Sequence, residues 1–178
     1  LIEPELECIS GVLVVELDPS GNASIEASEV VLSNTDNCQI EELSLSQNAF
    51  SCSDVEDLVL IQISSEDDSG NISDCIVSID VQDNTDPVFS CLNITVSLNV
   101  DGLATVAPGD IVLVVFEPCG IDDISLNIGS FDCDDIGINN VIISISDNNG
   151  NTGFCFADVT IVDETAPRGY RIVGDCDY

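Results

Sequence analysis

The sequence almost lacks positive charge. Its 178 residues include two lysine or arginine side chains and no histidine, against 34 aspartates and glutamates, so the formal net charge is −32. A chain this negative repels phosphate backbones and anionic lipids, which excludes nucleic acid and membrane surfaces as partners. Because there is no histidine and no C-x-x-C pair, neither a zinc site nor a haem attachment site is predicted.

Long apolar runs are missing as well. No stretch approaches the length of a membrane-spanning helix, and no basic segment followed by an apolar one opens the chain. We therefore expect no membrane insertion and, if the protein is exported, a mature piece or an excised part of a longer one. The chain does have 44% apolar residues, enough for a core, and nine cysteines. Since no metal-binding pattern explains these cysteines, we predict disulfides and an extracellular location.

The cysteines reveal an internal repeat. Those at positions 8, 38, 52 and 75 recur at 91, 119, 133 and 155, and residues 65–87 (SEDDSGNISDCIVSIDVQDNTDP) resemble residues 146–167 (SDNNGNTGFCFADVTIVDETAP). A nearly constant offset with a preserved pattern predicts two tandem modules, at residues 1–86 and 87–167. Residues 168–178 are expected to begin a following repeat or to form an inter-subunit segment, in which Cys176 pairs inside the next module or with another chain.

Within each module the hydrophobic period is two. Segments such as LVLIQIS, CIVSIDVQD, NITVSLNV and NVIISIS alternate or are rich in β-branched residues, and clusters of Asp, Asn, Gly and Ser separate them. No window has a sustained helical period. We predict an all-β fold of two tandem immunoglobulin-like β-sandwich modules with six or seven strands each, stabilised by disulfides. The lack of tryptophan argues against a true antibody-type domain.

The order of these features resembles the hyalin-repeat (HYR-like) modules and their relatives in bacterial surface adhesins. Such a module has a proline, a cysteine entering the first strand, a D-N-C loop, an F-x-C corner, an acidic D-x-x-G-N turn, a cysteine in the last strand and a V-x-D linker. The first module matches at Pro4, Cys8, Cys38, Phe50, Cys52, Asp67 or Asp68, Gly70, Asn71, Cys75 and Asp83. The second matches at Pro87, Cys91, Cys119, Phe131, Cys133, Asp147, Gly150, Asn151, Cys155 and Asp163, but has E-P-C in place of D-N-C.

Four cysteines allow three pairings in each module, and the residues alone do not choose among them. The resemblance implies bonds between the first and last strands, which are Cys8–Cys75 and Cys91–Cys155. The cysteines that remain would then form two short clips, Cys38–Cys52 and Cys119–Cys133. In the loop-entropy model each bond stabilises the fold by about 3–4 kcal/mol. The resemblance also implies an extracellular, non-catalytic spacer or adhesive array.

Carboxylates and carboxamides gather in the turns 66–71 and 146–151 and in the linkers 81–87 and 161–167. In a seven-strand sandwich the entering linker, the last turn and the loop after the second strand share one pole. Carboxylates converging there repel one another unless a cation is bound, and hard oxygen ligands suit Ca2+. The linker also resembles the calcium-binding joints of cadherins. The candidate calcium ligands are Asp83, Asp86, Asp122, Asp123, Asp147 and Asn149. The alternatives are ordinary turn formation and a solvated or halophile-like acidic surface.

Two functions of different classes fit these observations. One is a structural or adhesive repeat segment of an extracellular surface filament or adhesin, whose partners are neighbouring copies of the module or chain. The alternative is a carbohydrate- or surface-binding module, although six Phe, two Tyr and no Trp offer few platforms for a surface glycan. Catalysis is not expected, because no histidine is present to build a Ser-His pair. Asn22, Asn71 and Asn93 head N-x-S/T sequons, which allow glycosylation in a host with that machinery.

Overall fold

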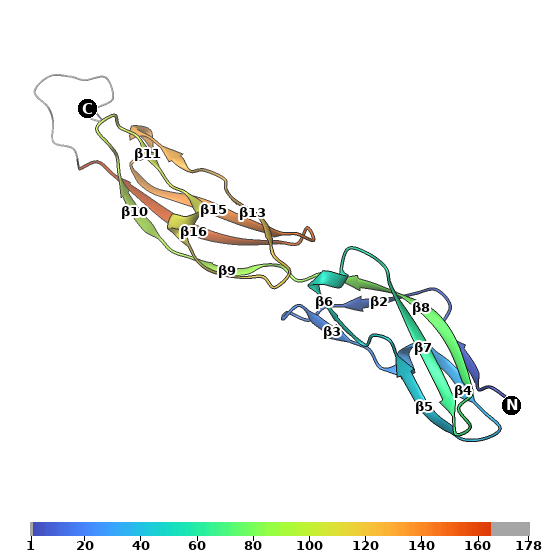
Figure 1. The fold of residues 1–178 in the computed structure, drawn as a ribbon. Helices are drawn as coiled ribbons and strands as arrows, with labels where there is room; N and C mark the ends of the chain where they lie inside the picture. The colour runs from blue at the N-terminus through green and yellow to red at the C-terminus, as the bar shows by residue number, and fades with distance from the viewer. Residues whose placement is uncertain (1, 165–178) are drawn as a thin grey trace, which may run out of the picture. The chain divides into compact units, whose positions relative to one another are not determined.

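The computed structural model describes residues 2–164, and the chain divides into two compact units (Figure 1). Unit 1 comprises Leu1–Thr85, and unit 2 begins at Asp86. Each unit is an immunoglobulin-like β-sandwich, so the predicted all-β fold of two tandem modules is confirmed. The expected third segment, 168–178, lies outside the described residues, and so does Cys176.

Unit 1 is built around a four-stranded sheet in the order β2-β8-β7-β5, while β1 pairs with β4 and β3 pairs with β6. Its elements are β1 (Glu5–Cys8), β2 (Val12–Glu16), β3 (Asn22–Ser24), α1 (Ala27–Val30), β4 (Val31–Thr35), β5 (Ile40–Leu45), β6 (Ala49–Ser51), η1 (Cys52–Asp54), β7 (Val59–Asp67) and β8 (Ile72–Gln82). Among the described strands of unit 1, only β2 and β8 run parallel, with Val12 opposite Ser78. The described part of unit 1 has eight strands rather than the six or seven predicted. The strands β3 and β6 were missed because, at three residues each, they are too short to show a hydrophobic period.

Unit 2 repeats this topology, with a four-stranded sheet in the order β10-β16-β15-β13 and the pairs β12-β9 and β11-β14. Its elements are β9 (Val88–Cys91), β10 (Ile94–Ser97), β11 (Ala104–Thr105), α2 (Pro108–Ile111), β12 (Val112–Phe116), β13 (Ile121–Leu126), β14 (Ser130–Phe131), η2 (Cys133–Asp135), β15 (Gly137–Asp147) and β16 (Thr152–Val162). The strand β10 runs parallel to β16, as β2 does to β8. The two units are therefore structural repeats of each other.

Alternating side chains of the two longest strands form the core of each unit. In unit 1 the buried side chains of β7 and β8 include Ile61, Ile63, Val77, Ile79 and Val81. In unit 2 those of β15 and β16 are Val141, Ile143, Ile145, Ala157, Val159 and Ile161. Removing a side chain of valine or isoleucine size from water stabilises the fold by roughly 1.5–3 kcal/mol. The residues between them face outward, which explains the period of two in the sequence.

The last hairpin of unit 1 defines two poles. Its turn, between β7 and β8, lies beside the residues at which the chain enters, because Ser73 Oγ donates a hydrogen bond to the carbonyl oxygen of Pro4 at 2.6 Å. We call this end the entry pole. From there β8 runs for 11 residues, roughly 35 Å, to the exit pole. At the exit pole the carbonyl oxygen of Gln82 accepts a hydrogen bond from Leu17 N at 2.8 Å.

The same two poles exist in unit 2. At its entry pole Thr152 N, just after the β15–β16 turn, donates to Asp86 Oδ1 at 3.1 Å. At its exit pole Leu98 N donates to the carbonyl oxygen of Val162, the last residue of β16, at 2.9 Å. Each unit therefore places its final turn at one end and the end of its final strand at the other.

One disulfide in each unit ties the first strand to the last. Cys8 of β1 is bonded to Cys75 of β8, and Cys91 of β9 is bonded to Cys155 of β16, with Cα–Cα distances of 6.4 and 6.1 Å. Both bonds were expected from the family resemblance and are confirmed. They close loops with sequence separations of 67 and 64 residues, and in the loop-entropy model each stabilises its unit by about 4 kcal/mol.

The short clip expected in unit 1 is wrong. Cys38 is free and exposed, whereas Cys52 is disulfide-bonded. Next to Cys38, the carbonyl oxygen of Gln39 accepts from Asp68 N of the entry-pole turn at 3.0 Å. Cys52 Sγ instead lies 3.9 Å from the carbonyl oxygen of Gly21, in the loop that follows β2 at the exit pole. The strand β5 carries the chain from one pole toward the other, so cysteines that are close in sequence lie far apart.

The clip expected in unit 2, Cys119–Cys133, is wrong for the same reason. The carbonyl oxygen of Cys119 accepts from Asn148 Nδ2 of the entry-pole turn at 3.0 Å. Cys133 Sγ lies 3.9 Å from the carbonyl oxygen of Gly102, in the loop that follows β10 at the exit pole. Both cysteines are disulfide-bonded, but about the length of β16 separates them.

Candidate functional site

The acidic turn that the sequence repeats is held together by one aspartate in each unit. In unit 2 Asp147, which is 2% exposed, accepts hydrogen bonds at Oδ1 from Asn149 N (2.9 Å) and Asn151 N (2.8 Å). Its Oδ2 accepts from Asn151 Nδ2 at 2.7 Å. Gly150 has a φ of 92°, a left-handed value that glycine adopts at little cost. The D-x-x-G-N pattern is therefore a turn whose carboxylate binds the backbone of the hairpin.

The equivalent carboxylate in unit 1 is Asp67, which is 1% exposed. It accepts from Asn71 Nδ2 (2.7 Å), Asn71 N (2.9 Å) and Ser69 N (2.8 Å). These donors favour the charged form, so they hold the pKa of Asp67 below its ordinary value. The side-chain amide of Asn71 has the largest effect, and desolvation opposes it.

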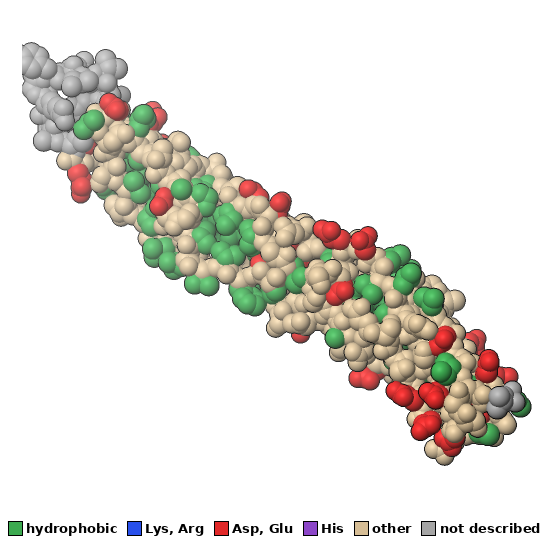
Figure 2. All heavy atoms as spheres, viewed as in Figure 1, with side chains coloured by type: hydrophobic (Ala, Val, Ile, Leu, Met, Phe, Trp, Pro, Cys, Tyr) green, Lys and Arg blue, Asp and Glu red, His purple; other side chains and the backbone are tan. Residues whose placement is uncertain are grey.

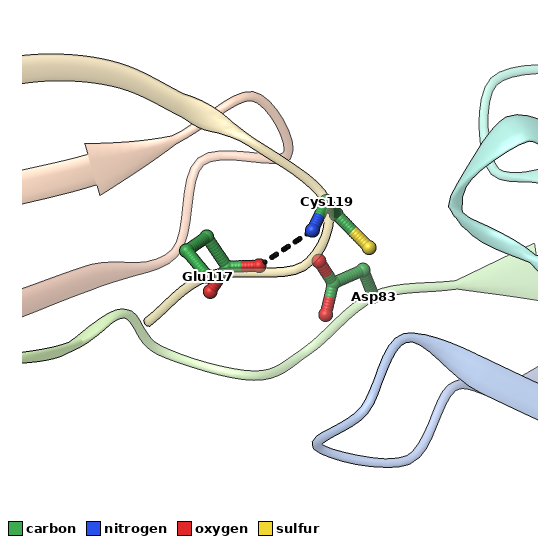
Figure 3. A group of neighbouring side chains, drawn as sticks. All are labelled: Asp83, Glu117 and Cys119. Atoms are coloured by element: carbon green, nitrogen blue, oxygen red, sulfur yellow. Dashed lines mark hydrogen bonds between the residues drawn. The ribbon is translucent and has the colours of Figure 1, made fainter. Parts of the chain in front are cut away.

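In both units a second acidic side chain accepts a hydrogen bond from the backbone N of the cysteine two residues later, although the two motifs differ. In the D-N-C loop of unit 1, Asp36 Oδ2 accepts from Cys38 N at 2.6 Å. In the E-P-C loop of unit 2, Glu117 Oε1 accepts from Cys119 N at 2.9 Å (Figure 3). Sequence reasoning treated the change from D-N-C to E-P-C as a departure and did not single out Glu117. The signal that could have found it is the acidic residue two positions before the cysteine in both loops.

The two linker carboxylates also accept backbone hydrogen bonds. Asp83, after β8, accepts at Oδ1 from Thr85 N at 3.0 Å and so shapes the end of unit 1. Asp86 holds the start of unit 2 to its last hairpin through Thr152 N. These residues fix the backbone where the chain leaves one unit and where it enters the other.

The remaining candidate ligands, Asp122, Asp123 and Asn149, belong to unit 2. Asp122 and Asp123 are exposed on β13, where the register with β15 shifts between Ile121 and Asp123. Asn149 is exposed, and its backbone N donates a hydrogen bond to Asp147 within the turn. Among the described residues of unit 2, no three carboxylates or thiols place their ligand atoms within 4.8 Å of one another. The structure thus does not gather the candidates of this unit into one cage.

The sequons occupy different environments. Asn22 and Asn93 are exposed. The side-chain nitrogen of Asn71 instead donates to Asp67 Oδ2 and to the carbonyl oxygen of Ile2, at 3.2 Å for the second bond. The Asn71 carboxamide is therefore part of the entry-pole turn.

Two surfaces bear on ligand binding. A shallow groove of about 530 Å³ beside β1 of unit 1 is lined by four carboxylates, two serines, Pro4, Leu6 and Ile72, without an aromatic ring. On unit 2, hydrophobic side chains gather on the visible face (Figure 2). The outer face of β15 and β16 includes Phe154 and Phe156, 63% and 72% exposed, with Ile138 and Ile142 on the neighbouring strand. Among the described residues, this apolar face is the only surface on which two aromatic side chains stand two positions apart on one strand and so point the same way.

No protein-family model matches the chain, and no curated protein matches it. Its fold is similar to a three-immunoglobulin-domain fragment, I67–I69, of titin, with a TM-score of 0.45 and 11% identity over 89% of this chain and 65% of that chain. It is also similar to human mucin-like protocadherin EC1-2, with a TM-score of 0.37 and 12% identity over 89% of this chain and 98% of that chain. The chain spans less than two thirds of the titin fragment.

No helix among residues 2–164 is both long enough and apolar enough to cross a membrane.

Proposed function

We propose that this chain is a structural or adhesive repeat segment of an extracellular surface filament or adhesin. The observation that carries the proposal is that both units have the same topology and the same disulfide between first and last strand. A repeated module with a covalent tie between its ends suits a chain that transmits tension. The disulfides also favour an oxidising environment outside the cell.

The load path through unit 1 follows from its covalent structure. Tension that enters before Cys8 crosses to Cys75 through the disulfide and leaves along β8. Once the other disulfides are removed, the loop between these cysteines, with a sequence separation of 67, bears no load while this bond is intact. Unit 2 has the same path through Cys91 and Cys155. The sandwich core is thereby protected from being pulled out strand by strand.

The proposal gives the two most buried turn carboxylates a role in folding rather than in catalysis. The most buried acidic side chains of the two turns, Asp67 and Asp147, accept several hydrogen bonds each from their own hairpins. A carboxylate whose oxygens already accept hydrogen bonds from its own hairpin is poorly placed to take a proton from a substrate. Their repetition in both units is explained by folding.

The test of this function is location. Gold-labelled antibodies against the chain, applied to intact cells of the source organism, should label structures outside the cell envelope, and external protease should remove the label. Label that appears only after the cells are permeabilised would contradict the proposal.

Calcium binding remains part of the proposal. The candidates Asp83, Asp86, Asp122, Asp123, Asp147 and Asn149 offer oxygen ligands, which fit Ca2+ in chemistry. No three described carboxylates of unit 2 place their oxygens within 4.8 Å of one another. We propose that the exposed pair Asp122 and Asp123 provides the first ligands. Calorimetry should then show binding at millimolar calcium that weakens as the pH falls toward about 4, where carboxylates protonate. The D122N/D123N variant should lose that heat, whereas the N149D variant should keep it; no heat with the unaltered chain would refute calcium binding.

A second candidate function is a carbohydrate- or surface-binding module, which the exposed Phe154 and Phe156 favour. Aromatic rings can stack on the apolar face of a sugar, and exposed apolar side chains mark interaction surfaces. A glycan array probed with the chain and with the F154S/F156S variant distinguishes the two functions. Binding that the variant loses supports this alternative, and the absence of binding by the unaltered chain refutes it.

A further inference from the structure

Cys38 differs from the other cysteines of the described residues. It is exposed and free, whereas the other seven are disulfide-bonded. An exposed, free thiol can ionise and attack an existing disulfide of another molecule, so Cys38 is able to exchange into a new disulfide.

Unit 2 shows what the equivalent position does. Cys119 occupies the place of Cys38, because the backbone N of each donates to the acidic side chain two residues earlier, at 2.9 and 2.6 Å. Each loop is also docked on the entry-pole turn, through Asn148 N to the carbonyl oxygen of Gly120 (3.2 Å) in unit 2 and Asp68 N to that of Gln39 in unit 1. Cys119 is disulfide-bonded. The same loop in the sister unit thus holds its cysteine in a geometry that forms a disulfide.

No cysteine of unit 1 can reach Cys38. Cys8 and Cys75 are bonded to each other. Cys52 lies at the exit pole, about the length of β8 away, far beyond the 7 Å limit on Cα separation in a disulfide. A partner for Cys38 must therefore come from outside its unit.

We propose that Cys38 is the attachment point for a second copy of this chain, joined through Cys133 of that copy. Besides the two cysteines of its long disulfide, each unit has one cysteine at its entry pole and one at its exit pole. Cys38 is at the entry pole of the first unit, and Cys133 is at the exit pole of the second. A bond between these unlike ends joins copies head to tail, and such a contact can repeat indefinitely into a filament.

The bond forms by thiol–disulfide exchange. Cys38 loses its proton to solvent, and its thiolate attacks Cys133 Sγ of the other copy, where the existing disulfide breaks. The sulfur that leaves departs with the electron pair and takes a proton from solvent, so one S–S bond is made for each one broken and no oxidant is needed. This inference names a partner for the structural role proposed above and rests on that role.

The experiment uses the complete chain. An equal mixture of 14N- and 15N-labelled protein is incubated in a glutathione redox buffer, quenched with acid and alkylated, and then analysed on non-reducing gels and by mass spectrometry of cross-linked peptides. We expect a ladder of covalent oligomers and mixed-isotope peptides that join Cys38 to Cys133. The C38S variant should remain monomeric and melt at the same temperature, because Cys38 is exposed.

Three results would overturn the proposal. They are a chain that stays monomeric although Cys38 is alkylated under native conditions, a Cys38–Cys38 dimer without higher oligomers, and a glutathione adduct of Cys38 as the sole product. None of these results would change the outcome of surface labelling. Failure of the head-to-tail bond and failure of the structural role are therefore distinguishable.

Discussion

The disulfide between the first and last strands should determine how far a unit lengthens under tension. To isolate it, the chain is pulled by its ends in a background that keeps only the two long bonds. That background replaces with serine Cys38, Cys52, Cys119, Cys133 and Cys176. In it, unfolding of unit 1 should release only the residues outside the loop that Cys8 and Cys75 close.

Removing the bond frees that loop. With a sequence separation of 67 residues and about 3.6 Å per extended residue, the C8S/C75S variant should gain about 240 Å of contour length when unit 1 unfolds. The folded Cα–Cα distance of 6.4 Å is negligible beside this length. The matched C91S/C155S variant should gain about 230 Å from unit 2, whose separation is 64 residues.

Single-molecule force spectroscopy measures both increments directly. Each variant should change one unfolding event and leave the other as it is in the background protein. When a reductant is added to the background protein, both units should unfold with their long increments in the same molecule. An increment for C8S/C75S equal to that of the background would refute the load path through Cys8 and Cys75.

Other predictions concern stability. A side chain at Gly153 would overlap the carbonyl oxygen of Pro87, so G153A should lower the free energy of unfolding by about 1–3 kcal/mol in urea denaturation. D147A leaves turn N–H groups without an acceptor and should cost about 2 kcal/mol, whereas the control N149A, which keeps the backbone bond, should change stability by less than about 0.5 kcal/mol. Folding lowers the pKa of Asp67, so this carboxylate stabilises the fold at pH values above the ordinary carboxylate pKa, and the stabilisation is lost as the pH falls through the lowered value. The difference in unfolding free energy between D67N and the unaltered chain should therefore shrink between pH 7 and pH 3. A constant difference would contradict this.

Hydrophobic alternation predicted the fold well because it is a local signal. The strands β7, β8, β15 and β16 bury every second side chain, so their sequences report their conformation. The repeat was equally visible, since both units need the same residues at the same places. The pairs β3–β6 and β11–β14 were not predicted, because strands of two or three residues carry no measurable period.

Long-range geometry was harder to predict. The short clips were inferred by pairing the two cysteines of each unit that remained after the long bond was assigned. These two cysteines are near in sequence, but the strand between them places them at opposite poles. The replacement of Ser73 by glycine at the matching position, 153, was not interpreted either. In unit 1 the serine hydroxyl bonds to the entering chain, and in unit 2 the entering chain lies closer than a side chain allows. Such differences depend on distances of a few tenths of an ångström, which a sequence does not contain.

The carboxylates show a third limit. Residue type identified Asp147 as a candidate ligand, and the same type also suits a turn, where it accepts hydrogen bonds from the backbone. Both readings were available from the sequence. Only the position of the side chain, 2% exposed and directed at its own hairpin, establishes the turn.

The parallel pairing of β2 with β8 has a consequence for how the protein matures. Val12 must find Ser78, and Val15 must find Val81, so the sheet of unit 1 closes through contacts between residues far apart in sequence. Such contacts slow folding, because the loop between the partners must be closed before they stabilise anything. During synthesis or export, unit 1 therefore stays open until its last strand emerges, and unit 2 waits in the same way for β16. The chain should therefore close one unit at a time, from the N-terminal end.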